Sequence, residues 1–338
     1  MAGGLKLGRP PASPLVILEV SMAEVEVKQK QTLLGGVVSF LLGKPRGRQE
    51  RLAGLSMTLP ALIFFIVFIG ISIVRTLLLG FQQWDAISAA TWIGLNNYIG
   101  LLNDEVFFHA LLVTLFLTAV LTLILSTIPM GIAVLFNMGW GRLGTIGRTM
   151  LFMPSIISLV ITAALWRMIL NPNYGTVNTL LANLGLASLQ QNWLGDENFV
   201  LYSIIVVSVW QSIGLYVIIF YAGLQGVDLN LYEAAAIDGA NSWQKFVHIT
   251  IPMIRPVFLM VITLNLLNGI KMFDIVYVLT RGGPVNASQT LGTDLYRVTF
   301  ANPGLPQFGY GSALSTVILF LCVLAVLFQI WMNKRSIV

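Results

Sequence analysis

The stretch "VLYSIIVVSVWQSIGLYVIIFYAGLQGV" (residues 200–227) contains no Asp, Glu, Lys or Arg. A helix needs about 20 apolar residues to cross a hydrocarbon core of about 30 Å, and this stretch exceeds that length. Its apolar residues are continuous, whereas the strands of a membrane barrel alternate apolar and polar residues. Because a helix satisfies its own backbone hydrogen bonds in lipid, the stretch predicts a transmembrane α-helix.

The whole chain has the composition of a polytopic membrane protein. Of its 338 residues, 57% are hydrophobic and only 10% are charged, against roughly 25% charged residues in soluble domains. We therefore expect an all-α fold with about six transmembrane helices. The apolar windows lie near residues 56–79, 107–136, 149–170, 199–224, 256–280 and 311–332.

The distribution of basic residues predicts the orientation of these helices. Most of the 19 Lys and Arg residues precede the first window, follow the last one, or fall in the loops at 137–150 and 225–255. By the positive-inside rule, these loops and both termini are cytoplasmic. We expect a cytoplasmic tail at residues 1–50 and a transmembrane domain at residues 51–338. Within the tail, residues 31–43 form a candidate interfacial helix, and a loosely ordered tail is the alternative.

The loop at 225–255 interrupts the apolar chain with a segment that favours short helices. Asn230 is a suitable N-cap for a helix that starts at Leu231, and Glu233 can return a hydrogen bond to it. Gly239 stands where that helix would end, since glycine adopts a left-handed conformation at the least cost. The pattern predicts a compact, structured cytoplasmic loop.

A second short helix is expected further along the same loop. Ser242 is its candidate N-cap, and Pro252 is expected to end it before the fifth window. An ordinary amphipathic connector on the membrane surface would explain the same residues equally well.

The spacing of six residues in this loop resembles the EAA signature of permease subunits in binding-protein-dependent ABC importers. These residues are Glu233, Ala234, Ala235, Gly239, Ile249 and Pro252. Ile251 stands where the family usually has Leu. Two further stretches resemble the carbohydrate branch of that family, the maltose and glycerol-phosphate permeases: "LWRMILNPNYGTVN" (165–178) and "FDIVYVLTRGGP" (273–284).

The resemblance implies a type I importer permease fold with a MetI-like core in a bacterial inner membrane. It implies an ATP-driven importer subunit that translocates a sugar or oligosaccharide by alternating access, with the loop at 225–255 coupled to the ATPase. The implied partners are a dimer of ATPase subunits, a second homologous permease, an extracytoplasmic solute-binding protein and the carbohydrate. No nucleic acid is expected, because the topology already accounts for the basic residues. The outer segments at 80–106, 171–198 and 281–310 would receive the binding protein.

The chain is not expected to be an enzyme. The stretch "GRLGTIGRT" (141–149) only superficially resembles a P-loop, because Arg148 stands where a lysine is needed. We therefore expect no cofactor in this chain, with ATP and magnesium bound by the partner ATPase. His109 and His248 are the two histidines of the sequence, too few for a histidine metal cluster, so no metal site is expected.

Polar side chains at helical spacing on the fourth and fifth windows are the candidate substrate-binding residues. Neutral sugars are held by hydrogen bonds and apolar contacts in a pocket shielded from lipid. Hydrogen bonds between membrane helices, worth about 0.6–2 kcal/mol each, are the alternative role. The candidates are Ser208, Gln211, Ser212, Tyr216, Asn265, Asn268, Gly269 and Met272.

Two charged residues near the end of the fifth window leave the charge of the substrate open. Lys271 and Asp274 are three residues apart, so on one helix they would form a local ion pair. Contact of Lys271 with an anionic substrate is the alternative. An ion- or proton-coupled secondary transporter of small polar solutes is the alternative function, but Asp274 is the only acid well inside a window, and such transporters usually need buried titratable relays.

Overall fold

The computed structural model describes residues 48–137 and 141–334. Residues 1–47 of the predicted tail, with the candidate interfacial helix at 31–43, lie outside the described residues. The chain divides into two compact units, Met1–Ser72 and Ile73–Val338. In the first unit, α2 (Arg48–Phe64) continues into a π-helical segment, η1 (Phe65–Gly70). The next helix, α3 (Ile71–Leu79), completes a candidate membrane span over Gly54–Leu79.

The second unit is helical apart from one short hairpin. Its strands, β1 (Gln82–Gln83) and β2 (Thr91–Trp92), pair antiparallel with Gln82 opposite Trp92. The helices are α4 (Asn96–Leu102), α5 (Glu105–Asn137), α6 (Gly141–Ile156), α7 (Leu159–Ile169), α8 (Thr176–Asn183), η2 (Ala187–Leu189), α9 (Val200–Gln225), α10 (Leu229–Ile237), α11 (Ser242–Lys245), η3 (Phe246–Thr250), α12 (Ile251–Ile270), α13 (Asp274–Leu279), α14 (Leu291–Thr299) and α15 (Phe308–Lys334).

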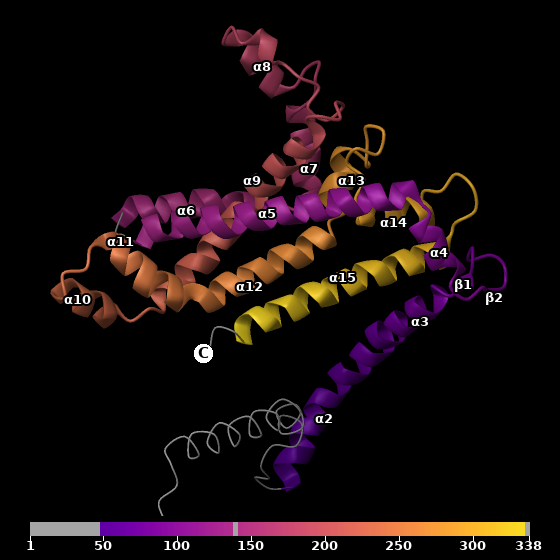
Figure 1. Ribbon diagram of the computed structural model, residues 1–338, viewed down its shortest axis with the longest axis horizontal. Coiled ribbons are helices and arrows are strands. Elements are labelled where there is room, and N and C mark those ends of the chain that lie inside the picture. Colours follow the sequence, from indigo (N-terminus) through magenta and orange to yellow (C-terminus); the bar gives the residue numbers. More distant parts are fainter. Residues whose placement is uncertain (1–47, 138–140, 335–338) are drawn as a thin grey trace, which may run out of the picture. The chain divides into compact units, whose positions relative to one another are not determined.

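The long helices of this unit give the bundle two distinct ends (Figure 1). Helices α10 and α11 lie at one end, called here the α10 end, and the β1–β2 hairpin and α4 lie at the other, called the hairpin end. Five helices of the described residues are long and apolar enough to cross a membrane, and a sixth span is a bent pair. The prediction of an all-α fold with about six membrane helices is confirmed.

The third predicted window is not one straight helix. It is divided into Gly144–Ile156 and Leu159–Ile169, which meet at an angle of 97°. The backbone leaves helical geometry at Ser158, whose φ and ψ are −56° and 140°. The carbonyl oxygen of Ile157 lies at this break and accepts a hydrogen bond of 3.4 Å from Gln211 Nε2 on α9. A side chain from a distant segment thus satisfies a backbone group that the break releases.

The fifth predicted window, 256–280, also differs from the structure. The helical span runs over Ser242–Ile270, and residues 274–279 form the separate helix α13. Pro252 therefore does not end a helix as predicted. It lies in the first turn of α12, directly after the π-helical η3, where the missing N–H of proline costs little.

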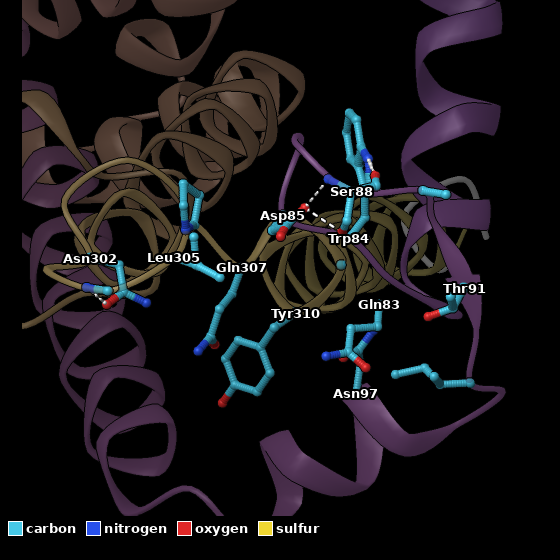
Figure 2. A pocket seen from close by; sticks show the side chains of 15 residues that line it. Gln83, Trp84, Asp85, Ser88, Thr91, Asn97, Asn302, Leu305, Gln307 and Tyr310 are labelled. Atoms are coloured by element: carbon cyan, nitrogen blue, oxygen red, sulfur yellow. Dashed lines mark hydrogen bonds between the residues drawn. The ribbon is translucent and has the colours of Figure 1, made fainter.

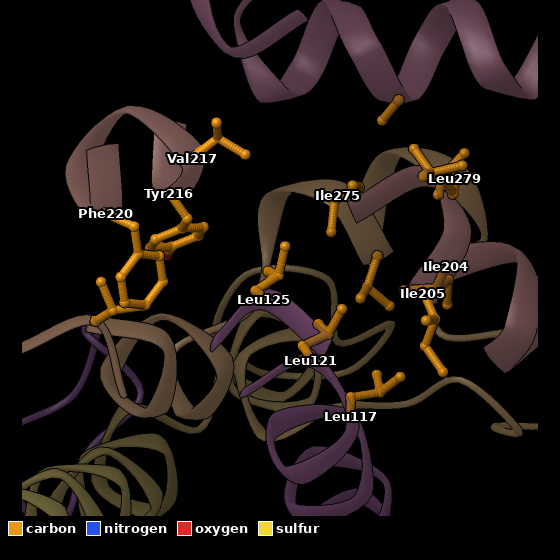
Figure 3. Packing of buried hydrophobic residues seen from close by; sticks show 14 of the residues in the cluster. Leu117, Leu121, Leu125, Ile204, Ile205, Tyr216, Val217, Phe220, Ile275 and Leu279 are labelled. Carbon is orange, nitrogen blue, oxygen red and sulfur yellow. The ribbon is translucent and has the colours of Figure 1, made fainter. Parts of the chain in front are cut away.

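Helix α9 is the centre of the bundle, since it packs against α5, α6 and α12. Leu117, Leu121 and Leu125 recur every four residues on the face of α5 that contributes to the core, as Figure 3 shows. Phe220 of α9 and Ile275 of α13 belong to the same buried cluster. Because lipid is as apolar as these side chains, the close fit of the helices, rather than transfer from water, stabilises this core.

A glycine sets the closest approach in the core. A Cβ atom added at Gly214 of α9 would collide with the carbonyl group of Leu151 on α6. The helices therefore contact each other backbone to backbone, as is common where small residues line membrane-helix interfaces.

We predict that Gly214→Ala destabilises the bundle by about 1–3 kcal/mol, because the new methyl group overpacks a backbone contact that cannot rotate away. Thermal unfolding of the detergent-solubilised protein measures the change. Gly131→Ala on α5 is the matched control, since no atom lies within 4 Å of its added Cβ. Equal melting temperatures for the two variants would show that the contact at Gly214 is not close.

Candidate functional site

The 225–255 loop begins with α10, whose N-cap is Asp228. Its Oδ1 accepts a hydrogen bond of 3.0 Å from the backbone N–H of Asn230. The prediction of Asn230 as the cap and Leu231 as the first residue was therefore wrong, because the carboxylate at Asp228 caps the helix two residues earlier. Gly239 has φ +80°, so the left-handed turn predicted after the helix is confirmed.

The second helix of the loop is also capped one residue earlier than predicted. Asn241, and not Ser242, is its N-cap: Asn241 Oδ1 accepts from the backbone N–H of Gln244 at 2.9 Å. Gln244 Oε1 accepts in return from the backbone N–H of Asn241 at 2.8 Å. This reciprocal capping box explains how the chain begins a new helix three residues after Gly239.

The six motif residues do not all lie on the surface of the loop. Glu233, Ala234, Gly239 and Pro252 are exposed, Ala235 is half-buried, and Ile249 packs against the main core. Three further apolar side chains of the loop are exposed, and the sequence analysis did not single them out. They are Leu229, Ile237 and Trp243, which are 73%, 87% and 70% exposed. Leu229 and Ile237 are four residues before and after Glu233 on α10, while Trp243 belongs to α11. In the sequence, these residues could not be told from core positions.

One hydrogen bond joins α10 to the start of the fifth span. The Tyr232 hydroxyl and Thr250 Oγ1 are 3.0 Å apart. Thr250 is buried at the end of η3, and Tyr232 packs against the main core. The sequence analysis missed this pair because the two residues are far apart in the chain. The bond therefore connects α10 to the helix that continues as α12.

The eight predicted substrate-binding residues line one cavity of about 450 Å³. This volume lies within the range of about 300–1,000 Å³ typical of small-molecule sites. Helices α9 and α12 supply the amide and hydroxyl groups, and α5 and α13 supply Leu121, Leu125 and Ile275. Phe273 and Leu159 also line the cavity and were not predicted, since apolar residues carry no signal that separates a cavity wall from a core.

On the α9 side, the polar groups are ordered by their own hydrogen bonds. Ser212 Oγ donates to Gln211 Oε1 at 2.8 Å, while Gln211 Nε2 reaches the break in the third span. Ser208 is 6% exposed, and its Oγ has no hydrogen-bond partner. This buried hydroxyl is available to a ligand in the cavity.

On the α12 side, the predicted residues differ in what they can offer a ligand. Asn265 Nδ2 donates to Val261 O on its own helix at 3.1 Å. Asn268 faces the hydroxyl of Tyr216 across the cavity and is exposed. A Cβ atom at Gly269 would approach Thr118 Oγ1 to 2.6 Å. Gly269 is therefore required for the contact between α12 and α5, as well as forming part of the wall.

Lys271 and Asp274 also line the cavity, but they do not form the ion pair predicted for them. Within residues 48–137 and 141–334, the ion pair closer than 4.0 Å is Arg297–Asp294. The reason is that α12 ends at Ile270 and α13 starts at Asp274, so the two residues do not share a helix. Both side chains are exposed in this chain.

A second, larger cavity of about 680 Å³ opens at the hairpin end, between the β1–β2 hairpin and the segment that leads into α15. Figure 2 shows Gln307 and Tyr310 on one side of it and Trp84 and Asp85 on the other. Hydrogen bonds from the backbone and side chain of Ser88 hold the pKa of Asp85 at about 2, so this carboxylate stays ionised. Most of the wall is made of the hairpin and loops, and Gly309 and Tyr310 at the start of α15 complete it.

A bundle of membrane-spanning helices that encloses a polar cavity and carries a structured loop at one end has the architecture of a transport permease. Residues 128–338 match the family model described as "Binding-protein-dependent transport system inner membrane component". The chain belongs to this family, and it is a permease of the ABC transporter class.

Individual relatives agree with this assignment. The chain is 35% identical to the probable ABC transporter permease protein YurN of Bacillus subtilis (strain 168), over 85% of this chain and 98% of that protein. It is 34% identical to the arabinooligosaccharides transport system permease protein AraP of the same strain, over 78% of this chain and 82% of that protein. A bacterial alginate ABC transporter, solved with an alginate pentasaccharide-bound periplasmic protein, shares the fold, with a TM-score of 0.74 and 23% identity over 85% of this chain and 96% of that chain.

These findings decide between the functions that the sequence left open. The resemblance to binding-protein-dependent permeases is confirmed, as are the type I importer fold and a multi-pass location in the inner membrane. The alternative of an ion- or proton-coupled secondary transporter is not supported. Relatives of this kind are permease subunits rather than enzymes.

We predict that Thr250→Val loosens α10, because it leaves the Tyr232 hydroxyl without its partner. Loss of one such bond costs about 1 kcal/mol, so the amide hydrogens of α10 should exchange about fivefold faster. Hydrogen–deuterium exchange of the purified protein measures this. Thr263→Val is the control, since Thr263 bonds within its own helix, to Leu259 O. Equal exchange in α10 of both variants would show that the bond does not hold the loop.

Proposed function

We propose that this chain is the transmembrane subunit of an ATP-driven importer that carries a sugar or oligosaccharide by alternating access. The observation that carries the proposal is the cavity in which amide and hydroxyl groups of α9 and α12 meet apolar and aromatic walls. Hydrogen-bonding groups without a surplus of charge suit a carbohydrate. The relative AraP, an arabinooligosaccharides transport system permease protein, supports the same substrate class.

A second, homologous permease completes the substrate path in this proposal. Asn268, Lys271 and Asp274 are exposed in this chain although they lie in or beside a membrane span. Polar residues at such positions face a bundle interior or a water-filled cavity rather than lipid. A partner permease that covers this side of α12 would shield all three from the hydrocarbon.

The 225–255 loop is the proposed coupling element. Its exposed Glu233 and Ala234 lie beside the apolar side chains of Leu229, Ile237 and Trp243. Exposed apolar groups around a charge fit a socket on another protein. We assign that socket to a dimer of ATPase subunits, which binds the ATP and magnesium that this chain has no motif to hold.

The hairpin end is the proposed docking face for an extracytoplasmic solute-binding protein. Trp92 and Leu305 are 64% and 62% exposed there, beside the cavity shown in Figure 2. This assignment places the α10 end and both termini in the cytoplasm, in agreement with the positive-inside rule. The binding protein would deliver sugar at one end while ATP acts at the other.

The proposed cycle follows from this arrangement. When ATP closes the ATPase dimer, α10 moves, and the Tyr232–Thr250 bond passes the movement to α12. Because α12 carries half of the polar cavity wall, its displacement relative to α9 changes the side from which the cavity is open. Hydrolysis then restores the first state.

We predict that Asn268→Ala raises the transport KM of the reconstituted importer about 3- to 10-fold, since one hydrogen bond to the sugar is lost. Uptake into proteoliposomes, with sugar-stimulated ATP hydrolysis, measures it. Leu264→Ala, at an exposed apolar position on the same helix, is the control and should leave KM unchanged. An unaltered KM for Asn268→Ala would remove this residue from the sugar site.

We predict that the double variant Glu233→Gln, Gly239→Ala is inserted in the membrane normally but loses most of its ATP-dependent uptake. A side chain at Gly239 strains the left-handed turn, and the lost charge weakens docking. Co-purification with the ATPase subunit and uptake measure the two effects. Asp238→Asn, which changes an exposed acid outside the motif, is the control. Normal uptake by the double variant would contradict the coupling role.

A further inference from the structure

Lys271 lines the cavity, and no ion pair joins it to another residue in the described part of the chain. Its backbone N–H caps the end of α12 by bonding Leu267 O at 3.3 Å. No carboxylate of the described residues lies within 4.0 Å of its ammonium group. A charge beside a membrane span that is not paired is costly, so such residues usually face a substrate or an ion pathway. Pairing with another described side chain of this subunit therefore does not explain the position of this lysine.

The break in the third span adds a second group of hydrogen-bond donors to the same cavity. Helix α7 starts at Leu159, which lines the cavity, and its N-cap Ser158 makes no side-chain capping bond. The first N–H groups of a helix point away from it and carry a partial positive charge. Broken membrane helices whose N-termini face a cavity are suited to anionic groups of a substrate.

The unpartnered hydroxyl of Ser208 is independent evidence for a ligand at this place. Ser208 is more than nine-tenths buried, lines the cavity, and has no partner for its Oγ. Chain direction brings it toward Lys271: α9 runs toward α10, and α12 runs away from it, so both residues lie on the hairpin side of the cavity. Helix α13, which follows Lys271, packs against α7, and Figure 1 shows the two helices at the same part of the bundle.

We infer that the cavity binds a carboxylated sugar, with Lys271 as counter-ion and with Ser208 and the start of α7 as hydrogen-bond donors to the carboxylate. This inference rests on the proposed function and assigns the substrate class within it. Asn268 and Gln211 would then bind the neutral hydroxyl groups of the same sugar chain.

The charges favour a carboxylate over a phosphate. Asp274 lines the same cavity, so the two charged side chains sum to zero before a ligand binds. A single negative charge can bind next to Lys271 while Asp274 accepts hydrogen bonds from sugar hydroxyls. A dianionic phosphate would add a second charge that has no counter-ion and would repel Asp274.

Binding to the assembled importer in lipid nanodiscs, without the solute-binding protein, tests the inference. The probes are glucuronic acid, which carries one carboxylate, its methyl ester, and glucose 6-phosphate. The ester keeps the sugar skeleton and removes the charge. We expect the wild-type complex to bind the acid at least tenfold more tightly than the ester, and both more tightly than the phosphate.

The variants Lys271→Met and Lys271→Arg separate charge from shape. Lys271→Met should lose about tenfold in affinity for the acid and leave the ester unchanged, while Lys271→Arg should retain the preference for the acid. Assembly with the partner subunits shows that each variant is folded. Equal binding of acid and ester by the wild type, tighter binding of glucose 6-phosphate, or equal losses for both probes in Lys271→Met would overturn the inference.

The proposed function has a separate outcome in this experiment. A complex that binds or transports neutral sugars, with no effect of Lys271→Met, retains the role of a carbohydrate importer and refutes only the acidic substrate. A complex that binds no sugar probe at all but hydrolyses ATP in response to another solute refutes the carbohydrate assignment itself.

Discussion

Hydrocarbon offers no hydrogen-bond partners, and the structure depends on this constraint. In the described part of the chain, the spans satisfy their backbones internally as helices, and a break in a span needs another partner or a cavity for the groups that it releases. The bent third span is the clearest case. At its break, Ile157 O accepts from Gln211 on α9, and the next helix begins at the cavity wall. Irregular backbone, polar side chains and the cavity therefore occur together, because backbone groups released from a helix find no hydrogen-bond partner in hydrocarbon.

Close packing of the helices stabilises the bundle and makes the shape of the cavity sensitive to small helix displacements. In lipid, burial of apolar groups contributes little to helix association, so contact between backbones matters more. Gly214 brings α9 against α6, and Gly269 brings α12 against α5. These two helices carry the polar groups of the cavity. A small displacement of either one changes the cavity, because packed interfaces shift between discrete arrangements rather than deform continuously.

The loop and the cavity are linked by the chain itself. Tyr232 and Thr250 join α10 to η3, and the helical span from Ser242 continues without interruption to Ile270. The span ends beside Lys271 at the cavity. The loop at the α10 end is thus connected to the cavity through one continuous helix, and a π-helical segment lies where the two meet. A rigid element with its two ends at two sites is suited to transmit displacement from one to the other.

The sequence by itself determined the all-α class, the approximate number of spans and the left-handed turn at Gly239. Composition, apolar length and the conformational freedom of glycine act locally and need no knowledge of neighbours. The sequence also singled out the polar residues of α9 and α12, because their helical spacing places them on one face of each helix. The tertiary structure alone decided the break at Ser158, the end of α12 at Ile270 and the separation of Lys271 from Asp274. Those features depend on partners far away in the chain, such as Gln211 for Ile157 O, and hydropathy along the sequence does not record such contacts.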